Sequence, residues 1–211
     1  MGSISDRPAP TGSPNWPRVD AILAGAARAF AAHGYAATSM RQVAQYTGAS
    51  LGSIYHHFGS KEGLLQAILT TNFRRVRAAL EERLTEITDP AEAITAFVEN
   101  HVAFFTRDLD AMKVMSHELS TLRGTAGEEV RALRDAYTER ARGFLRRLRP
   151  DLGRDEAEVA TLCFFGMLNW TYRWVHSLPS TTTPAELAGQ MARLFLDGFA
   201  GTVTARRSPG G

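Results

Sequence analysis

The sequence predicts an all-α fold. Apolar residues recur at three- and four-residue spacing along most of the chain, as they do on one face of a helix. Ser, Thr or Asp precedes several of these segments and Gly or Pro follows them, which is typical of helix caps. Strand-like alternation of convincing length is not evident in the 211 residues.

The bulk composition is that of a globular chain, with 44% apolar and 22% charged residues. The net charge of +2 is too small to indicate nucleic-acid binding by itself. No apolar run is long enough to cross a bilayer, and the N-terminus lacks the apolar core of a signal peptide. The single cysteine, Cys163, lies in an apolar stretch, which predicts a small buried side chain and excludes an internal disulfide. We therefore expect a reducing, cytoplasmic compartment, no membrane partner and no cofactor.

Composition divides the chain into four parts. Residues 1–17 are rich in Gly, Ser and Pro and predict a disordered arm, and residues 206–211 predict a disordered tail. Residues 18–62 predict an N-terminal domain of three helices. Residues 63–205 predict a larger helical domain.

Capping residues separate the three N-terminal helices. A helix at about 18–33 ends before a glycine, the next opens on the capping-box pattern of Ser39 and Gln42, and the third follows another glycine. The residues that mark these boundaries are Gly34, Ser39, Gly48, Ser50 and Gly59. The second and third helices, with the turn between them, have the layout of a helix-turn-helix.

The third helix carries small residues and then a row of rings. Small side chains near its N-terminus would let the backbone approach the major groove of DNA, which is about 12 Å wide. These are Ser50, Gly52 and Ser53. Tyr55 and His56 can donate to phosphate oxygens, Lys61 opens the next helix with a positive charge, and Phe58 is predicted to plug the core. Taken singly, Tyr55 is equally compatible with a half-buried core position, and His57 with a surface position without a role.

Residues 22–69 resemble the DNA-binding domain of the TetR family of bacterial transcriptional regulators. The matching stretches are ILAGAARAF, Gly34-Tyr35, TSMRQVA, GASLGSIYHHF and SKEGLL. The resemblance implies a DNA-contact surface made by Thr38, Ser39, Arg41, Ser50, Gly52, Ser53, Tyr55, His56 and Lys61. Many relatives have Val in place of Ala49 and a basic residue in place of Leu51. Leu51 either touches the methyl group of a thymine, or it leaves this chain with one phosphate contact fewer than relatives that have a basic residue there. The base preference is therefore open.

The C-terminal domain predicts six helices, at about 61–87, 91–107, 109–119, 127–149, 154–177 and 184–204. The outer face of 127–149 is charged and is predicted to be solvated. The helix at 154–177 is apolar on several sides and must therefore be buried on several sides. A second copy of the chain would cover it. The family resemblance likewise implies a homodimer through 154–177 and 184–204, with two recognition helices about 34 Å apart on a palindromic double-stranded operator.

Large apolar side chains with a few polar groups among them predict a ligand pocket in this domain. The candidates are Phe97, His101, Phe104, Met112, Met115, Leu119, Tyr137, Phe164, Met167, Asn169, Trp170 and Trp174. For any one of them taken alone, an ordinary core position is favoured, and only the set as a whole indicates a pocket. Residues 165–174 and 184–199 are similar to a branch of the family that responds to acyl-CoA thioesters. That similarity implies a small hydrophobic effector, with Arg146, Arg147 or Arg173 near the CoA head.

These features predict a ligand-responsive DNA-binding transcriptional regulator, a repressor released by its effector. A drug-like or steroid-like effector is left open beside acyl-CoA. An enzyme acting on acyl-CoA esters and a lipid-binding dimer without DNA are the alternatives. Nucleophile-elbow, phosphate-loop and Ser-His-Asp patterns are not evident, so no catalytic residue is expected. His56 and His57 point about 100° apart on a helix, which does not favour a metal site.

Overall fold

The computed structural model describes residues 16–205, with side chains for residues 19–199. This part of the chain consists of helices joined by short loops, without strands. The helices are α1 (Trp16–His33), α2 (Met40–Thr47), α3 (Leu51–Phe58), α4 (Lys61–Arg83), α5 (Pro90–Phe105), α6 (Leu109–Glu118), α7 (Gly124–Leu148), α8 (Arg154–Asn169), α9 (Thr171–Trp174) and α10 (Pro184–Ala205), with 3₁₀ turns η1 (Leu119–Thr121) and η2 (Val175–Ser177). The predicted arm and tail lie outside the described residues, except that α1 already begins at Trp16.

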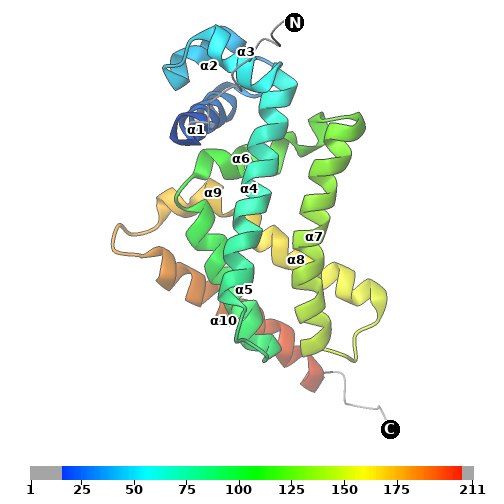
Figure 1. The fold of residues 1–211 in the computed structure, drawn as a ribbon. Coiled ribbons are helices and arrows are strands. Elements are labelled where there is room, and N and C mark those ends of the chain that lie inside the picture. Colours follow the sequence, from blue (N-terminus) through cyan, green and yellow to red (C-terminus); the bar gives the residue numbers. More distant parts are fainter. Residues whose placement is uncertain (1–15, 206–211) are drawn as a thin grey trace, which may run out of the picture.

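Helices α1, α2 and α3 form a head at the N-terminal end of α4 (Figure 1). The predicted capping box of α2 is confirmed: the Ser39 hydroxyl accepts from the N–H of Gln42, whose side chain accepts from the N–H of Ser39. Gly48 ends α2 in the left-handed conformation that glycine favours, with φ at 66°. Val43 and Ile54 are completely buried and tie α2 and α3 to the core.

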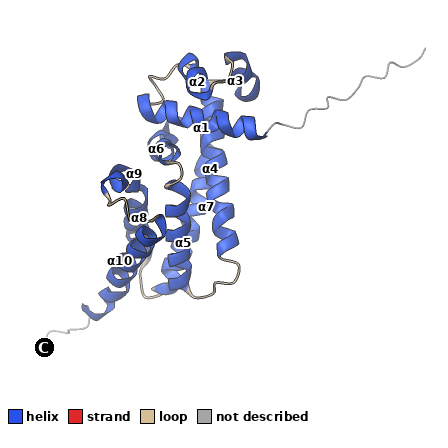
Figure 2. Cartoon of the chain, turned by 90° about the vertical axis from the view of Figure 1, so that its left-hand side faces the viewer, coloured by secondary structure: helices blue, strands red, loops and turns tan. Residues whose placement is uncertain are grey.

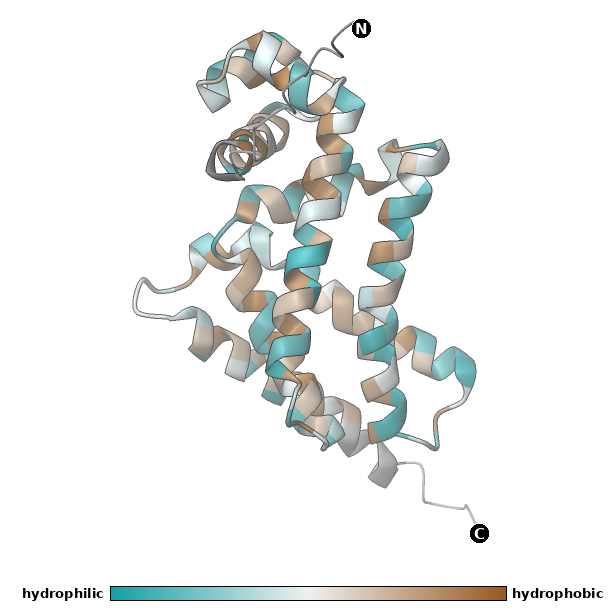
Figure 3. Cartoon of the chain, in the orientation of Figure 1, coloured by the Kyte–Doolittle hydropathy of each residue, from teal (hydrophilic) through white to brown (hydrophobic). Residues whose placement is uncertain are grey.

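Helix α4 connects the head to the rest of the molecule and runs the length of both domains (Figures 1 and 2). Figure 3 shows hydrophobic residues recurring along it, with hydrophilic residues between them. Its buried residues are Leu64, Leu65, Ile68, Leu69, Thr70, Phe73, Val76 and Leu80. Since each large apolar side chain contributes roughly 1.5–3 kcal/mol when fully buried, this row holds α4 against both domains at once.

The C-terminal domain is built around α5, which contacts α4, α6, α7, α8 and α10. Asp89 caps α5 by accepting from the N–H groups of Ala91 and Glu92, and Pro90 occupies the first helical position. The helix is buried for most of its length, with Phe97 and Val98 completely enclosed. A single hydrophobic core therefore continues from the head through α4 into this domain.

One predicted helix is interrupted. The segment expected to be continuous over 154–177 is divided into α8, α9 and η2, with the break at Trp170. The hydroxyl of Thr171 donates to the carbonyl of Leu168 at 2.7 Å, which takes an acceptor away from the helical ladder. Such a local side-chain bond is not visible in hydrophobic spacing.

The predicted C-terminal end of α4 also lies too far along the sequence. It ends at Arg83 rather than near Ile87, and just beyond that end the hydroxyl of Thr85 donates to the carbonyls of Glu81 and Glu82. None of the helices in the described part of the chain is long and apolar enough to cross a membrane.

Candidate functional site

The outer side of α2 and α3 presents most of the side chains predicted to contact DNA. Ser39, Arg41, Ser50, Gly52, Tyr55 and His56 are exposed, and Ser53 is half-buried. The Ser50 hydroxyl accepts from the N–H of Ser53 at 3.1 Å and thereby fixes the first turn of α3. A Cβ built on Gly52 would meet no atom of this chain within 4 Å. The space beside Gly52 is therefore open for a partner outside the chain.

The rings of α3 divide between surface and core. Tyr55 is 45% exposed, so the half-buried core reading of this residue is not supported. Phe58 is partly buried and packs against the core, as predicted. Leu51 also packs against the core, which accounts for its apolar side chain without a thymine methyl.

Thr38 occupies a different place from its predicted neighbours. Its side chain is 2% exposed, and its hydroxyl donates to the carbonyls of Gly34 at 2.7 Å and Ala29 at 3.3 Å. The hydroxyl therefore fastens the turn after α1 from inside. The structure does not bring the Thr38 side chain to the exposed face of the head.

Lys61 is held by the backbone that follows α1. Its ammonium group donates to the carbonyls of Tyr35 at 2.7 Å, Thr38 at 2.9 Å and Ala36 at 3.2 Å. The same group lies 4.4 Å from the centre of the Tyr35 ring. An ammonium group has three N–H donors, and these carbonyls account for all of them. Lys61 thus joins the start of α4 to the turn between α1 and α2.

Two glycines that the sequence interpretation did not single out set the helix crossings of the head. A Cβ on Gly25 would lie 2.8 Å from Cγ2 of Thr47, where α1 crosses α2. A Cβ on Gly63 would lie 2.2 Å from the carbonyl oxygen of Phe58, where α3 meets α4. The orientation of α3 therefore depends on the missing side chain at Gly63.

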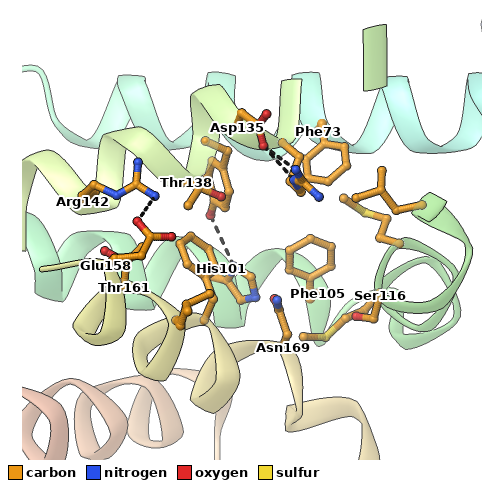
Figure 4. A pocket seen from close by; sticks show the side chains of 17 residues that line it. Phe73, His101, Phe105, Ser116, Asp135, Thr138, Arg142, Glu158, Thr161 and Asn169 are labelled. Carbon is orange, nitrogen blue, oxygen red and sulfur yellow. Dashed lines mark hydrogen bonds and ion pairs between the residues drawn. The ribbon is translucent and has the colours of Figure 1, made fainter. Parts of the chain in front are cut away.

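A cavity of about 450 Å³ lies in the C-terminal domain, bounded by α4, α5, α6, α7 and α8 (Figure 4). Residues from all five helices and from η1 line it: Phe73, His101, Phe105, Met112, Met115, Ser116, Leu119, Arg134, Asp135, Tyr137, Thr138, Arg142, Glu158, Thr161, Leu162, Phe165 and Asn169. The volume is within the range of small-molecule sites, roughly 300–1,000 Å³.

Half of the predicted pocket residues line this cavity. They are His101, Met112, Met115, Leu119, Tyr137 and Asn169. The others do not line it: Phe97, Phe104, Phe164, Met167, Trp170 and Trp174. Phe97 and Phe164 pack against each other in the core with tilted rings whose centroids are 5.5 Å apart, whereas Trp170 is 55% exposed. The residue types alone could not distinguish the residues that line the cavity from those that fill the core.

The lining also includes charged side chains that the sequence interpretation missed. Arg134, Asp135 and Arg142 come from the face of α7 that was predicted to be solvated. Arg142 forms ion pairs with Glu158 at 2.8 Å and with Glu139. The four-residue spacing of Arg134, Thr138 and Arg142 could have indicated this, because it places the three polar side chains on one side of α7, beside Tyr137. The cavity therefore has an apolar interior and a charged edge.

A second, polar hollow of about 330 Å³ adjoins that edge. It shares Arg142 and Glu158 with the cavity. Its other lining residues are Glu139, Arg146, Arg154 and Ala157. Of the arginines predicted near a CoA head, Arg146 lies here, while Arg147 donates to the carbonyl of Thr88 and Arg173 lies over the ring of Trp170.

Burial dominates the electrostatics of the cavity interior. It lowers the pKa of His101 to about 3, so the imidazole is neutral at physiological pH. It also raises the pKa of Tyr137, so the phenol keeps its proton. The two side chains meet across the cavity wall, with Nδ1 of His101 3.4 Å from the Tyr137 hydroxyl.

Helix α6 lies between the cavity and the head. Its cavity side carries Met112, Met115 and Ser116. From its other side, Lys113 donates to the carbonyl of Ala31 at 2.5 Å, and Glu118 accepts from the N–H of Tyr35 at 3.3 Å. A change in the cavity is therefore one helix away from the C-terminal end of α1.

An apolar stripe is exposed on α8 and α10. Its members are Val159, Leu162, Cys163, Trp170 and Leu194. Leu194 is 74% and Leu162 63% exposed, which is unusual for leucine. The predicted burial of Cys163 is wrong for the single chain, because this thiol lies on the stripe and not in the core. Leu162 belongs both to the stripe and to the cavity lining.

Known proteins resemble this chain over both domains. The "HTH-type transcriptional repressor AcnR" of Corynebacterium diphtheriae is 33% identical over 62% of this chain and 68% of its own length. A TetR-family regulator from Bordetella parapertussis has a crystal structure with a TM-score of 0.78 at 31% identity, covering 87% of this chain and 96% of that one. AibR in complex with isovaleryl coenzyme A and operator DNA gives a TM-score of 0.72 at 25% identity, over 84% of this chain and 97% of that one.

Two family models agree with these likenesses. Residues 22–68 match the model of bacterial regulatory proteins of the tetR family, and residues 87–199 match a tetracyclin repressor-like C-terminal domain. The first model covers most of the head, and the second covers the apolar stripe and all of the cavity residues except Phe73. The chain therefore belongs to the TetR family of transcriptional regulators.

Proposed function

We propose that this protein is a transcriptional repressor that binds a palindromic operator as a homodimer and is released by a hydrophobic effector such as an acyl-CoA thioester. The observation that carries this proposal is the combination of an exposed recognition surface on α3 with a cavity lined by five helices in the same chain. The proposed activity is the regulation of transcription and not the catalytic turnover of a substrate. The proposed location is the bacterial cytoplasm, where the DNA lies.

The DNA side of the proposal rests on Arg41, Tyr55 and His56, which are exposed together on α2 and α3. Ser39, Ser50, Gly52 and Ser53 would let the backbone come close to the groove, and Lys61 would add its charge near a phosphate. The side chain of Thr38 is proposed to hold the turn. The apolar stripe supports a dimer through α8 and α10, since a stripe this apolar is covered in most soluble proteins.

The effector side rests on the cavity and its neighbour. An apolar acyl chain suits the interior, and the arginines of the adjoining hollow suit the phosphates of CoA. AibR, which has the same fold, was crystallised with an acyl-CoA and operator DNA. Binding would act on the head through α6, whose opposite side holds Ala31 and Tyr35. A coupling of about 1–3 kcal/mol between the two sites is enough for regulation.

Gel-shift titration with the DNA upstream of the gene for this chain tests the proposal. We expect the wild-type protein to retard a palindromic fragment and Arg41→Ala to weaken that binding. Arg77→Ala is the matched control, because Arg77 is an exposed arginine of α4 outside the head. Equal loss from both variants would refute the assigned surface.

Two further arms test the dimer and the effector. Leu194→Asp places a charge on the apolar stripe and should give a monomer that no longer binds the operator, whereas Ala185→Asp, on the opposite side of α10, should do neither. Acyl-CoA thioesters of increasing chain length should release the DNA from the wild-type dimer. Retention of the complex at saturating ligand would refute the effector class.

A further inference from the structure

A buried row of polar side chains leads from α4 to the wall of the cavity. Nδ2 of Asn100 donates to the carbonyl of Val76 at 2.9 Å. Burial raises the pKa of Tyr137, and a side-chain hydrogen bond with Asn100 acts against that rise. The Tyr137 hydroxyl in turn lies 3.4 Å from Nδ1 of His101. All three side chains belong to residues that are 3% exposed.

The direction of these hydrogen bonds follows from their chemistry. A hydrogen bond that lowers the pKa of a phenol donates to its oxygen, because it stabilises the phenolate. An arrangement in which Tyr137 accepts from Asn100 and donates its own O–H to Nδ1 of His101, 3.4 Å away, satisfies both contacts. A neutral imidazole that accepts at one nitrogen carries its hydrogen on the other. In this arrangement the hydrogen of His101 lies on Nε2.

That donor has no partner. Within the described residues, Nε2 of His101 is buried and forms no hydrogen bond, although the ring lines the cavity. Its nearest ring neighbour is Phe105, 4.6 Å away between centroids. Figure 4 places His101 in the middle of the lining, between Thr138 and Asn169. Since unpaired buried donors are rare in folded proteins, this nitrogen, beside the rings of Phe105 and Phe165, is a hydrogen-bonding group that a ligand could satisfy.

We propose that the Nε2–H of His101 donates to a carbonyl oxygen of the effector that lies within the apolar body of the ligand rather than at its end. This inference rests on the proposed function in taking the cavity as the effector site. In an acyl-CoA the acceptor is the thioester oxygen, and in a steroid-like ligand it is a ring ketone. An otherwise identical ligand without that oxygen leaves the imidazole donor unpaired and binds more weakly.

Calorimetric titration of the full-length protein with a matched pair of ligands tests the inference. One ligand is octanoyl-CoA and the other is S-octyl-CoA, a thioether that has the same chain but no carbonyl. We expect the thioester to bind the wild-type protein about tenfold more tightly or better. Equal affinity for the two ligands would overturn the inference while leaving the effector class of the proposed function intact.

The variant His101→Phe keeps a ring in the cavity wall and removes the donor. We expect it to lose the preference for the thioester while its affinity for the thioether stays within about threefold of wild type. His176→Phe is the matched control, since His176 is exposed on η2 and does not line the cavity. A preference that survives in His101→Phe would assign the discrimination to another group and overturn the inference.

A second ligand pair separates this inference from the acyl-CoA assignment. If neither CoA derivative binds, the effector class fails, and 4-phenylbutan-2-one and butylbenzene then probe the cavity directly by ligand-observed NMR. Tighter binding of the ketone that disappears in His101→Phe supports the carbonyl contact. Equal binding, or no binding of either probe, overturns it.

The tautomer supplies a measurement on the unaltered protein. Nitrogen-15 NMR of labelled histidines distinguishes an imidazole protonated on Nε2 from one protonated on Nδ1. We expect the proton of His101 on Nε2 in the wild type, with the His101→Phe spectrum identifying the resonance. A proton on Nδ1 would overturn the inference.

Discussion

The head and the cavity are assembled in opposite ways. The recognition surface lies on two adjacent helices, α2 and α3, within one short stretch of chain. The cavity takes residues from five helices, from Phe73 on α4 to Asn169 at the end of α8. The head therefore depends on local capping and on close helix crossings, whereas the cavity depends on how distant helices pack. A single substitution should accordingly damage each region in a different way.

The largest expected effect is in the head, at Gly63. We expect Gly63→Ala to lower the free energy of unfolding by about 3 kcal/mol, because the added methyl group overlaps the carbonyl of Phe58. Displacement of α3 should also lower operator affinity at least about tenfold. Chemical denaturation and gel shifts measure the two effects.

Gly52→Ala is the counterpart of that substitution on the exposed face of α3. Its added methyl group meets nothing inside the chain, so we expect unchanged stability and weaker operator binding. If both variants lose stability equally, the local account of the head is wrong.

Lys61 gives the next largest effect. We expect Lys61→Met to lose about 2 kcal/mol of stability, because three backbone carbonyls lose a charged donor. Lys61→Arg should retain part of it. The salt dependence of operator binding shows whether Lys61 also contacts a phosphate. If it does, the slope of log affinity against log salt concentration should fall in Lys61→Met by about one charge. Wild-type stability in Lys61→Met would contradict the clamp.

The cavity gives the smallest effect, through pH. The pKa of His101 is about 3 in the folded protein, compared with 6.5 for a histidine free of the fold. Between pH 3 and 6.5, therefore, the His101 imidazole takes up a proton only in the unfolded chain. The stability that neutral His101 contributes is thus present above pH 6.5 and declines as the pH falls. Between pH 7.5 and 5.5 we expect a loss of about 1.4 kcal/mol.

Urea denaturation of wild type and His101→Phe at both pH values isolates this contribution. The difference in stability between the two proteins should change with pH by that amount. His176→Phe is the control for replacing an exposed histidine that does not line the cavity. Parallel pH curves for wild type and His101→Phe would show that the imidazole titrates normally.

The same contrast explains how far the sequence could be interpreted. Caps and spacing predicted the head down to the capping box of Ser39, because those signals act over a few residues. They did not reveal that Gly25 and Gly63 stand at helix crossings, since the atoms they make room for are remote or lie beyond a turn. Thr38 and Lys61 were read as parts of a surface, yet their donors point to the chain's own backbone.

For the cavity, composition predicted a pocket, but only six of the 17 residues that line it. Met112 and Met115 line it while Phe97 and Phe164 fill the core, although all four are large and apolar. The rotation of each helix about its axis decides the difference, and packing partners far along the chain set that rotation. The break at Trp170 is different, because it coincides with a local hydrogen bond from the hydroxyl of Thr171 to the carbonyl of Leu168.

The sequence contains only two lysines, and each grips a carbonyl near the end of α1, Lys113 from the cavity side and Lys61 from the DNA side. Selective labelling of the lysine side chains with nitrogen-15 would therefore place one spectroscopic reporter on each side of the end of α1 while keeping these hydrogen bonds. Titrating operator or effector into such a sample would register the two halves of the switch as separate signals, without a single mutation.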